Sequence, residues 1–472
     1  MAGWKKIPLP EIVFEPASMF DNSGRVFRWR GRVYRAIRAE SAGFYRGLFE
    51  KYNIQELFDY GLVRTGIAPL SLEGYSLILN HDRIPIISYC VEWGAEMLRD
   101  AALLICDLTA RLHDRGLVLK DVHPWNILFD HGKPVFIDWG SIFPASEVAE
   151  WPYLQFRDRL IWPLYLMSAG AFRIARLSML GPPGSLRLGD VIRLLLKRIP
   201  LQALVRFWRS DLELKRRRFR VDADYFQSLR RLLESIPLIE EKTKWDDYDL
   251  PYRKLSFRPA EDWPLKARNV YKVLQELRPQ SVTDIGCNKG WFSELATLGG
   301  ASVVAMDTDE PSINALYRGS RTKNLSILPL VMDICYPTPA HGLLQVYPTP
   351  ETRLSGDLVM ALALVHHLVF KRGLSFRVIA AQLAAFTRQC LIVEFIPPGD
   401  YWVSKWMNEK FSWYSLDNFI SVLREYFPRI EVMDSSPAPR VLLVCDRQES
   451  GAMGKALAAG RSKILLKSKI MN

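Results

Sequence analysis

The residues most suited to chemistry are the stretch DIGCNKG at positions 284–290, which follows a short apolar run. Glycines let the backbone approach a ligand closely, and the start of the following helix offers free N–H groups. A second apolar run, 301–306, ends in Asp307. An acid at this distance beyond the glycines, roughly 20 residues, can receive ribose hydroxyls. The pattern predicts a site for a nucleoside-type cofactor in the C-terminal half.

A second constellation lies in the N-terminal half, where four residues separate Asp121 from Asn126 and Asp138 follows an apolar run. Phosphoryl transfer needs a carboxylate that orients the accepting hydroxyl and two oxygen ligands for magnesium. The D-x-x-x-x-N spacing and the later acid supply these groups in the required order. We predict Asp121 as the catalytic carboxylate, with Asn126 and Asp138 as ligands of Mg²⁺ beside ATP.

The elements around these residues differ between the two halves. In the first half, alternation and helical periodicity predict a hairpin, a helix, three short strands and a long helix with one apolar stripe. In the second half, helices alternate with strands, which is typical of a wound parallel sheet. The expected elements are the hairpin 25–37, helices 41–52, 97–113 and 265–277, and strands 62–64, 75–79, 84–89, 281–285, 302–306, 325–332, 358–364, 391–395, 429–433 and 441–445.

The loop DVHPWNIL at 121–128, followed by IDW at 137–139, closely resembles the aminoglycoside phosphotransferase and choline kinase branch of the kinase-like superfamily. The resemblance implies an α+β kinase-like fold. Arg35 stands at about the position of the lysine that grips the phosphates of ATP, and Glu50 or Glu40 would be its helix partner. Arginine is a bulkier fork and does not substitute cleanly for lysine. The sequence therefore allows both an active small-molecule or sugar kinase and a nucleotide-binding or structural relic.

Seven expected strands with a glycine turn after the first resemble the class I S-adenosylmethionine (SAM)-dependent methyltransferases, an α/β Rossmann-like fold. In that family an acid before the first glycine, here Asp284, faces the amino-acid end of SAM. Asn288 stands where many members have a middle glycine, and asparagine tolerates left-handed backbone. By the same resemblance Asp333, at the end of the third strand, approaches the adenine amino group. The expected cofactor-binding residues of this half are Asp284, Gly286, Asn288, Gly290, Asp307 and Asp333.

The segments ALALVHHL at 361–368 and EFIPP at 394–398 resemble methyltransferases described as host-specific nodulation proteins, and their relatives in bacterial polysaccharide gene clusters. Histidine suits proton removal from a hydroxyl acceptor near neutral pH. We predict His366 or His367 as the base and Glu394 as a supporting or substrate-contacting acid. The alternative is that the histidine pair caps the following helix or bonds to backbone.

The net charge of +12 is unevenly distributed along the chain. Residues 151–220 carry 15 Lys and Arg against four Asp and Glu, which gives +11, and 451–472 carry five against none. These regions could contact an anionic membrane surface or substrate, or simply face water. Nucleic acid is disfavoured, because the basic cluster 215–218 has little aromatic interleaving. The absence of an apolar leader or a long apolar run predicts a cytoplasmic protein, peripheral at most to the inner face of the membrane.

We therefore expect a kinase-like domain at 1–240, a polar linker at 241–258, a methyltransferase domain at 259–447 and a basic tail at 448–472. The leading hypothesis is a bacterial bifunctional kinase-like methyltransferase that acts on a carbohydrate, glycolipid or polysaccharide intermediate. One alternative makes the first domain a pseudokinase that binds substrate or docks on a membrane. Another is nucleic-acid methylation. The six scattered cysteines, without C-x-x-C spacing, are expected to be reduced thiols.

Overall fold

The computed structural model describes residues 4–181, 188–196, 200–238, 245, 252, 255, 257 and 263–447. The chain divides into two compact units. The first comprises Met1–Glu240 with Ala340–Pro348, and the second comprises Glu241–Pro339 with Thr349–Asn472. Most of the expected linker and the whole expected tail lie outside the described residues. In the described part of the chain, no helix is long and apolar enough to cross a membrane.

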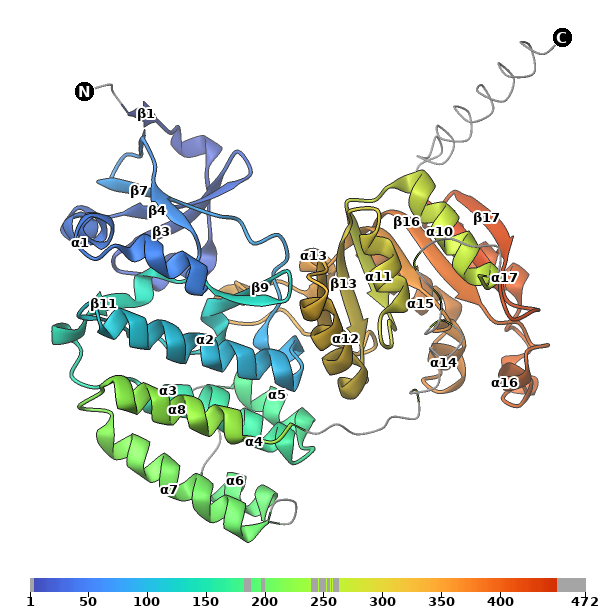
Figure 1. Ribbon diagram of the computed structural model, residues 1–472. Helices are drawn as coiled ribbons and strands as arrows, with labels where there is room; N and C mark the ends of the chain where they lie inside the picture. The colour runs from blue at the N-terminus through green and yellow to red at the C-terminus, as the bar shows by residue number, and fades with distance from the viewer. Residues whose placement is uncertain are drawn as a thin grey trace. The chain divides into compact units, whose positions relative to one another are not determined.

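The first unit begins with an antiparallel sheet of five strands (Figure 1). The expected hairpin forms its centre, and Arg30 and Gly31 turn the chain with positive φ at both positions, as tight hairpins require. The helix expected at 41–52 is α1, Ala39–Glu50. The strands, in sheet order, are β2 (Val13–Phe14), β3 (Gly24–Trp29), β4 (Arg32–Ile37), β7 (Leu77–His81) and β5 (Thr65–Ile67).

A mostly helical part follows, and its centre is α2, Ala95–His113. The apolar stripe predicted from the sequence is completely buried on this helix: Leu98, Ala102, Ile105, Leu108 and Leu112. The strands β8 (Leu117–Leu119), β9 (Ile127–Asp130), β10 (Lys133–Phe136) and β11 (Ile142–Pro144) pair antiparallel, β8 with β11 and β9 with β10. The later helices are α3 (Tyr153–Phe156), α4 (Trp162–Ser168), α5 (Phe172–Leu180), α6 (Leu188–Leu195), α7 (Leu201–Arg217) and α8 (Ala223–Ser235).

The first unit is completed by a segment from far down the chain, 340–348, which we call the strap. His341 and Tyr347 pair with each other through two backbone hydrogen bonds of 3.1 Å. Their rings pack on Trp125, at centroid distances of 4.8 Å and 5.2 Å, and on Tyr89. The sequence boundaries had assigned these residues to the second domain. The strap therefore holds an aromatic residue of the 121–128 loop.

The second unit contains a sheet of seven strands in the order β14-β13-β12-β15-β16-β18-β17. The first five are parallel, and β18 is antiparallel to both of its neighbours. The strands are β12 (Ser281–Ile285), β13 (Ser302–Asp307), β14 (Ile327–Val331), β15 (Gly356–Ala361), β16 (Thr387–Phe395), β17 (Arg429–Asp434) and β18 (Val441–Asp446). All seven expected strands are present, and the order reverses beside β12. Crevices at such reversals bind ligands at the carboxyl ends of the strands.

Helices cover this sheet and supply its core (Figure 1). Apolar residues of α10 (Leu265–Leu277), α11 (Trp291–Thr297) and α12 (Glu310–Thr322) share one buried cluster with alternate residues of β12, β13 and β15. The helices α15 (Phe376–Phe386) and α17 (Leu416–Leu423) pack on each other. The short helices are α13 (Pro350–Arg353), α14 (Val365–Phe370) and α16 (Tyr401–Ser404).

Two strand predictions in the first unit are wrong. Residues 84–89 form no strand, because Pro85 removes a ladder donor from the apolar run. Residues 62–64 contribute only a single bridge, between Leu62 and Phe136, and the strand begins at Thr65. In the second unit the strand expected at 358–364 ends at Ala361, and Ala363 has a φ of 52°.

Candidate functional site

The turn after β12 is shaped by residues in left-handed backbone. Gly286 and Gly290 both have a φ of 78°, and Asn288 has a φ of 52°. A side chain at Gly290 would meet Leu316 at 2.5 Å, so this glycine lets the turn pack on α12. The nearest side chain to a Cβ on Gly286 is Leu364, at 3.5 Å. The turn therefore requires glycine at 290 for packing and favours it at 286 for backbone conformation.

Asp307, at the end of β13, fixes this turn from the neighbouring strand. Its Oδ2 accepts from the backbone N–H of Asn288 at 2.8 Å, and its Oδ1 accepts from that of Asp309 at 3.0 Å. Burial raises the pKa of the Asp307 carboxyl, while these backbone donors oppose the shift. Each carboxylate oxygen has a second lone pair available for a ligand hydroxyl.

A pocket of about 440 Å³ opens beside the turn, at the carboxyl ends of β12–β15. Gly286, Asn288, Asp307 and Asp333 all line it, so the fold brings together four of the six cofactor residues expected in this half. Asp333 accepts from Cys335 N–H at 2.9 Å and pairs with Arg372 at 2.8 Å. The other lining residues are Trp245, Ile285, Thr308, Met332, Ile334, Leu362, Ala363, Leu364, His367, Leu368, Lys371 and Arg372.

The structure separates the two histidines of α14. His367 lines the pocket, whereas His366 is buried, is not among the lining residues and stacks on Trp406. Burial, reinforced by neighbouring cationic groups, lowers the pKa of His366 to about 2. A ring with that pKa is a poor proton acceptor at neutral pH. Of the two candidate bases, His367 therefore has the better position.

Two predicted site residues are in different places from those expected. Asp284 is buried behind the turn, where it accepts from Ser293 Oγ at 2.6 Å, and it does not line the pocket. Burial raises its pKa to about 7. Glu394 is completely buried and bonds to Lys266 Nζ and Ser435 Oγ, both at 2.7 Å. Glu394, predicted as a supporting or substrate-contacting acid, does not line the pocket and is paired inside the unit instead.

In the first unit, the residues of the phosphoryl-transfer constellation converge. Asn126 Nδ2 lies 3.4 Å from both Asp138 Oδ2 and the carbonyl oxygen of Asp121. Asp138 Oδ1 accepts from Gly140 N–H at 3.0 Å, and the backbone N–H of Asp121 donates to Ser141 Oγ. The loop after β8 and the loop after β10 thus bring Asn126 and Asp138 into contact, with the amide nitrogen of Asn126 facing the Asp138 carboxylate.

Arg35, on β4, faces this constellation from the sheet. It is buried and pairs with Asp138 at 2.9 Å and with Asp21. Burial alone would lower the pKa of the guanidinium, but the Asp138 and Asp21 carboxylates raise it above its ordinary value. Within the described part of the chain, Arg35 does not pair with Glu50 or Glu40 as expected, since both glutamates are exposed on α1.

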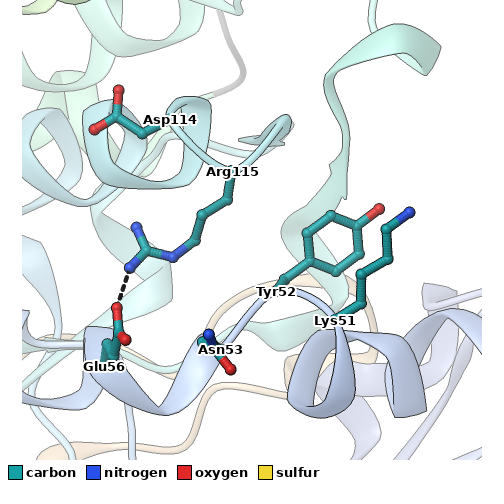
Figure 2. A pocket seen from close by; sticks show the side chains of 6 residues that line it. All are labelled: Lys51, Tyr52, Asn53, Glu56, Asp114 and Arg115. Carbon is teal, nitrogen blue, oxygen red and sulfur yellow. Dashed lines mark hydrogen bonds and ion pairs between the residues drawn. The ribbon is translucent and has the colours of Figure 1, made fainter.

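A separate hollow of about 450 Å³ in the first unit is lined by charged and polar groups (Figure 2). Arg115 donates to Glu56 at 2.5 Å across one side of it. Asp121, Asn126 and Asp138 do not line the hollow, so it is distinct from the place where the sequence predicts phosphoryl transfer. Its lining residues are Lys51, Tyr52, Asn53, Glu56, Asp114 and Arg115.

Trp245, Lys371 and Arg372 are among the pocket residues that sequence reasoning missed. Trp245 belongs to the stretch treated as a polar linker. The two basic residues follow the last turn of α14, and only their place after the histidine pair could have suggested them. All six cysteines are free thiols, and five are buried.

The residues present fit a nucleoside cofactor in the second unit, since the turn offers close backbone approach and Asp307 presents carboxylate lone pairs. In the first unit, Asn126 and Asp138 carry oxygen atoms of the kind that Mg²⁺ prefers. Asp138 forms an ion pair with Arg35. The sheet order, the turn and the acid-lined pocket are those expected from the resemblance to the class I SAM-dependent methyltransferases.

Comparison with known proteins gives a like-sized relative. The chain is 27% identical over 446 residues to the nodulation protein NoeA of Rhizobium meliloti (strain 1021), covering 86% of this chain and 90% of that protein. No protein-family model matches the chain.

Two solved structures overlap parts of the chain. The bifunctional kinase-methyltransferase WbdD is 19% identical with a TM-score of 0.29, covering 46% of this chain and 45% of its own. This chain thus spans about half of WbdD. Magnesium protoporphyrin IX methyltransferase (ChlM) from Synechocystis PCC 6803, with bound SAM, is 17% identical with a TM-score of 0.30, covering 44% and 92%.

Proposed function

We propose that the second unit transfers a methyl group from SAM to a hydroxyl of a carbohydrate, glycolipid or polysaccharide intermediate. The observation that carries the proposal is the pocket itself, which joins the glycine turn, two strand-end acids and His367 around one space. The carbohydrate class of the acceptor rests on the resemblance of segments 361–368 and 394–398 to nodulation-type and polysaccharide-cluster methyltransferases.

Each residue has a distinct task in this reaction. When bound, SAM supplies a methyl group that is activated by its positive sulfur. Asp307 receives the ribose hydroxyls, and Asp333 accepts from the adenine amino group. Asn288 and Gly286 bring backbone next to the cofactor. His367 takes the proton of the acceptor hydroxyl and holds that oxygen in line with the methyl group.

Calorimetric titration of the full chain with SAM tests the cofactor assignment. Binding is expected for the natural chain and is expected to be lost in Gly286→Val, because a β-branched residue resists a φ of 78° and would crowd the ligand. Failure of the natural chain to bind SAM would refute the proposal. The exposed Gly43→Ala, where a Cβ meets nothing within 4 Å, is the control.

Labelled SAM incubated with fractionated cell-envelope extract then identifies the acceptor. Label in an envelope carbohydrate or glycolipid fraction is expected, and it should fall about 10²–10⁴-fold in His367→Ala if this side chain acts as the base. Transfer to RNA that disappears at high salt would favour the nucleic-acid alternative instead.

A second function, phosphoryl transfer, is favoured by the convergence of Asp121, Asn126 and Asp138 in the first unit. Asp121 would orient the accepting hydroxyl. Asn126 and Asp138 would hold Mg²⁺ beside ATP, once Arg35 has moved from Asp138 to the phosphates. ATP turnover that vanishes in Asp138→Ala supports this function. Absence of turnover in the natural chain would leave the first unit as the substrate-binding or docking pseudokinase.

A further inference from the structure

Trp245 is a pocket residue to which the cofactor and base assignments give no role. Its ring is part of the lining, although it lies in the stretch that the sequence marked as a linker. The backbone carbonyl of Trp245 accepts from Asn288 Nδ2 at 3.3 Å. Its ring stands edge to face with the His367 ring, with centroids 5.2 Å apart and planes at 74°.

Through these two contacts Trp245 links Asn288, in the turn after β12, with His367 on α14. Asn288 is held in left-handed backbone in the turn after β12, and Asp307 fixes its N–H. His367 projects from α14, after β15. The Nζ of Lys371, another lining residue, lies 5.5 Å from the Trp245 ring centroid. The Trp245 ring therefore contacts His367, the proposed base, and Lys371. The Trp245 backbone is hydrogen-bonded to Asn288 in the turn after β12.

We propose that Trp245 is a positioning residue for methyl transfer. It orients His367 through its ring, and its anchorage on Asn288 keeps that ring in place at the cofactor turn. This inference rests on the proposed function, because it assumes SAM at the turn and a proton acceptor at His367. A ring that merely filled space would contribute to folding without setting the His367 geometry.

The first experiment is calorimetric titration of SAM into the full chain and into Trp245→Ala, Trp245→Phe and Trp208→Ala. Because Trp245 lines the pocket, loss of its ring should weaken SAM affinity about two- to tenfold in Trp245→Ala. Trp245→Phe keeps a ring and should recover most of that loss. Trp208, which is 50% exposed on α7 of the first unit, is the matched control and should have no effect.

The second experiment measures the exposure of His367 directly. Carbethoxylation mapped by mass spectrometry should be several-fold faster at His367 in Trp245→Ala and close to the natural rate in Trp245→Phe. His131, whose side chain is 49% exposed in the first unit, is the internal reference and should react at the same rate in all variants. Turnover at saturating SAM should fall with the same ranking, since loss of positioning lowers kcat and does not act only on KM.

The outcomes distinguish the positioning role of Trp245 from the proposed methyl transfer. If the natural chain binds no SAM, both the methyl transfer and the positioning role are refuted. If it binds SAM but Trp245→Ala keeps the natural affinity and the natural carbethoxylation rate at His367, the positioning role alone is refuted. A phenylalanine that restores folding but neither affinity nor His367 protection would also contradict it.

Discussion

Replacing Asp284 by asparagine should change how the stability of the second unit depends on pH. Asp284 is buried behind the glycine turn, and its folded-state pKa is raised from 3.8 to about 7, mainly by burial. The protonated form is thus favoured in the folded chain. The contribution of the protonated Asp284 to the free energy of unfolding is fully present below the unfolded pKa of 3.8. It is lost as the pH rises from 3.8 through the folded pKa of about 7.

The size of the effect follows from the two pKa values. At ~1.36 kcal/mol for each unit of pKa, a rise from 3.8 to about 7 corresponds to ~4 kcal/mol of lost stability at alkaline pH. This is an upper limit, because the introduced amide must still find a donor or acceptor for each of its polar atoms. Its oxygen can accept from Ser293 in place of the carboxylate, and it carries no charge. Asp284→Asn should therefore stabilise the unit by ~2 kcal/mol near pH 8 and by much less near pH 5.

Urea unfolding of the full chain between about pH 5 and about pH 8, followed by hydrogen exchange of β12 amides, measures this difference. The control is Asp434→Asn, an exposed carboxylate on β17, whose effect on stability should be small throughout. A difference between Asp284→Asn and the natural chain that does not change with pH would refute the reasoning.

Three further predictions concern packing. Glu394→Gln removes the carboxylate that pairs with the buried Lys266 ammonium and should lower the free energy of unfolding by ~3–5 kcal/mol; a loss below ~1 kcal/mol in urea titration would contradict this. Gly290→Ala would place a methyl 2.5 Å from Leu316 at a positive φ and should cost ~1–3 kcal/mol, measured as a lower Tm and partly restored by Leu316→Ala. In the strap, Tyr347→Ala should speed hydrogen exchange in loop 121–128 and leave β12–β15 unchanged; unchanged exchange in the loop would show that the strap does not hold it.

Local sequence patterns predicted a helix or strand correctly where the conformation of that element depends mainly on its own residues. The apolar stripe of α2 is buried as its 3.6-residue period predicts, and the seven strands of the second unit occur in the expected places. The run at 84–89 shows the limit of such patterns, since apolar composition alone did not reveal that Pro85 prevents pairing. Of the acids predicted for this site, Asp307 and Asp333 line the pocket, whereas Asp284 and Glu394 do not.

The amino-acid sequence by itself determined the order of elements, the left-handed turn at 286–290 and the spacing of the groups after each strand, because these depend on neighbours in the chain. Tertiary structure decided which of those groups face a ligand. Glu394 is neutralised by Lys266 from α10, Arg35 meets Asp138 from another loop, and Trp245 meets His367 from a distant part of the chain. Burial and ion pairing between distant segments set these outcomes, and no local pattern records them.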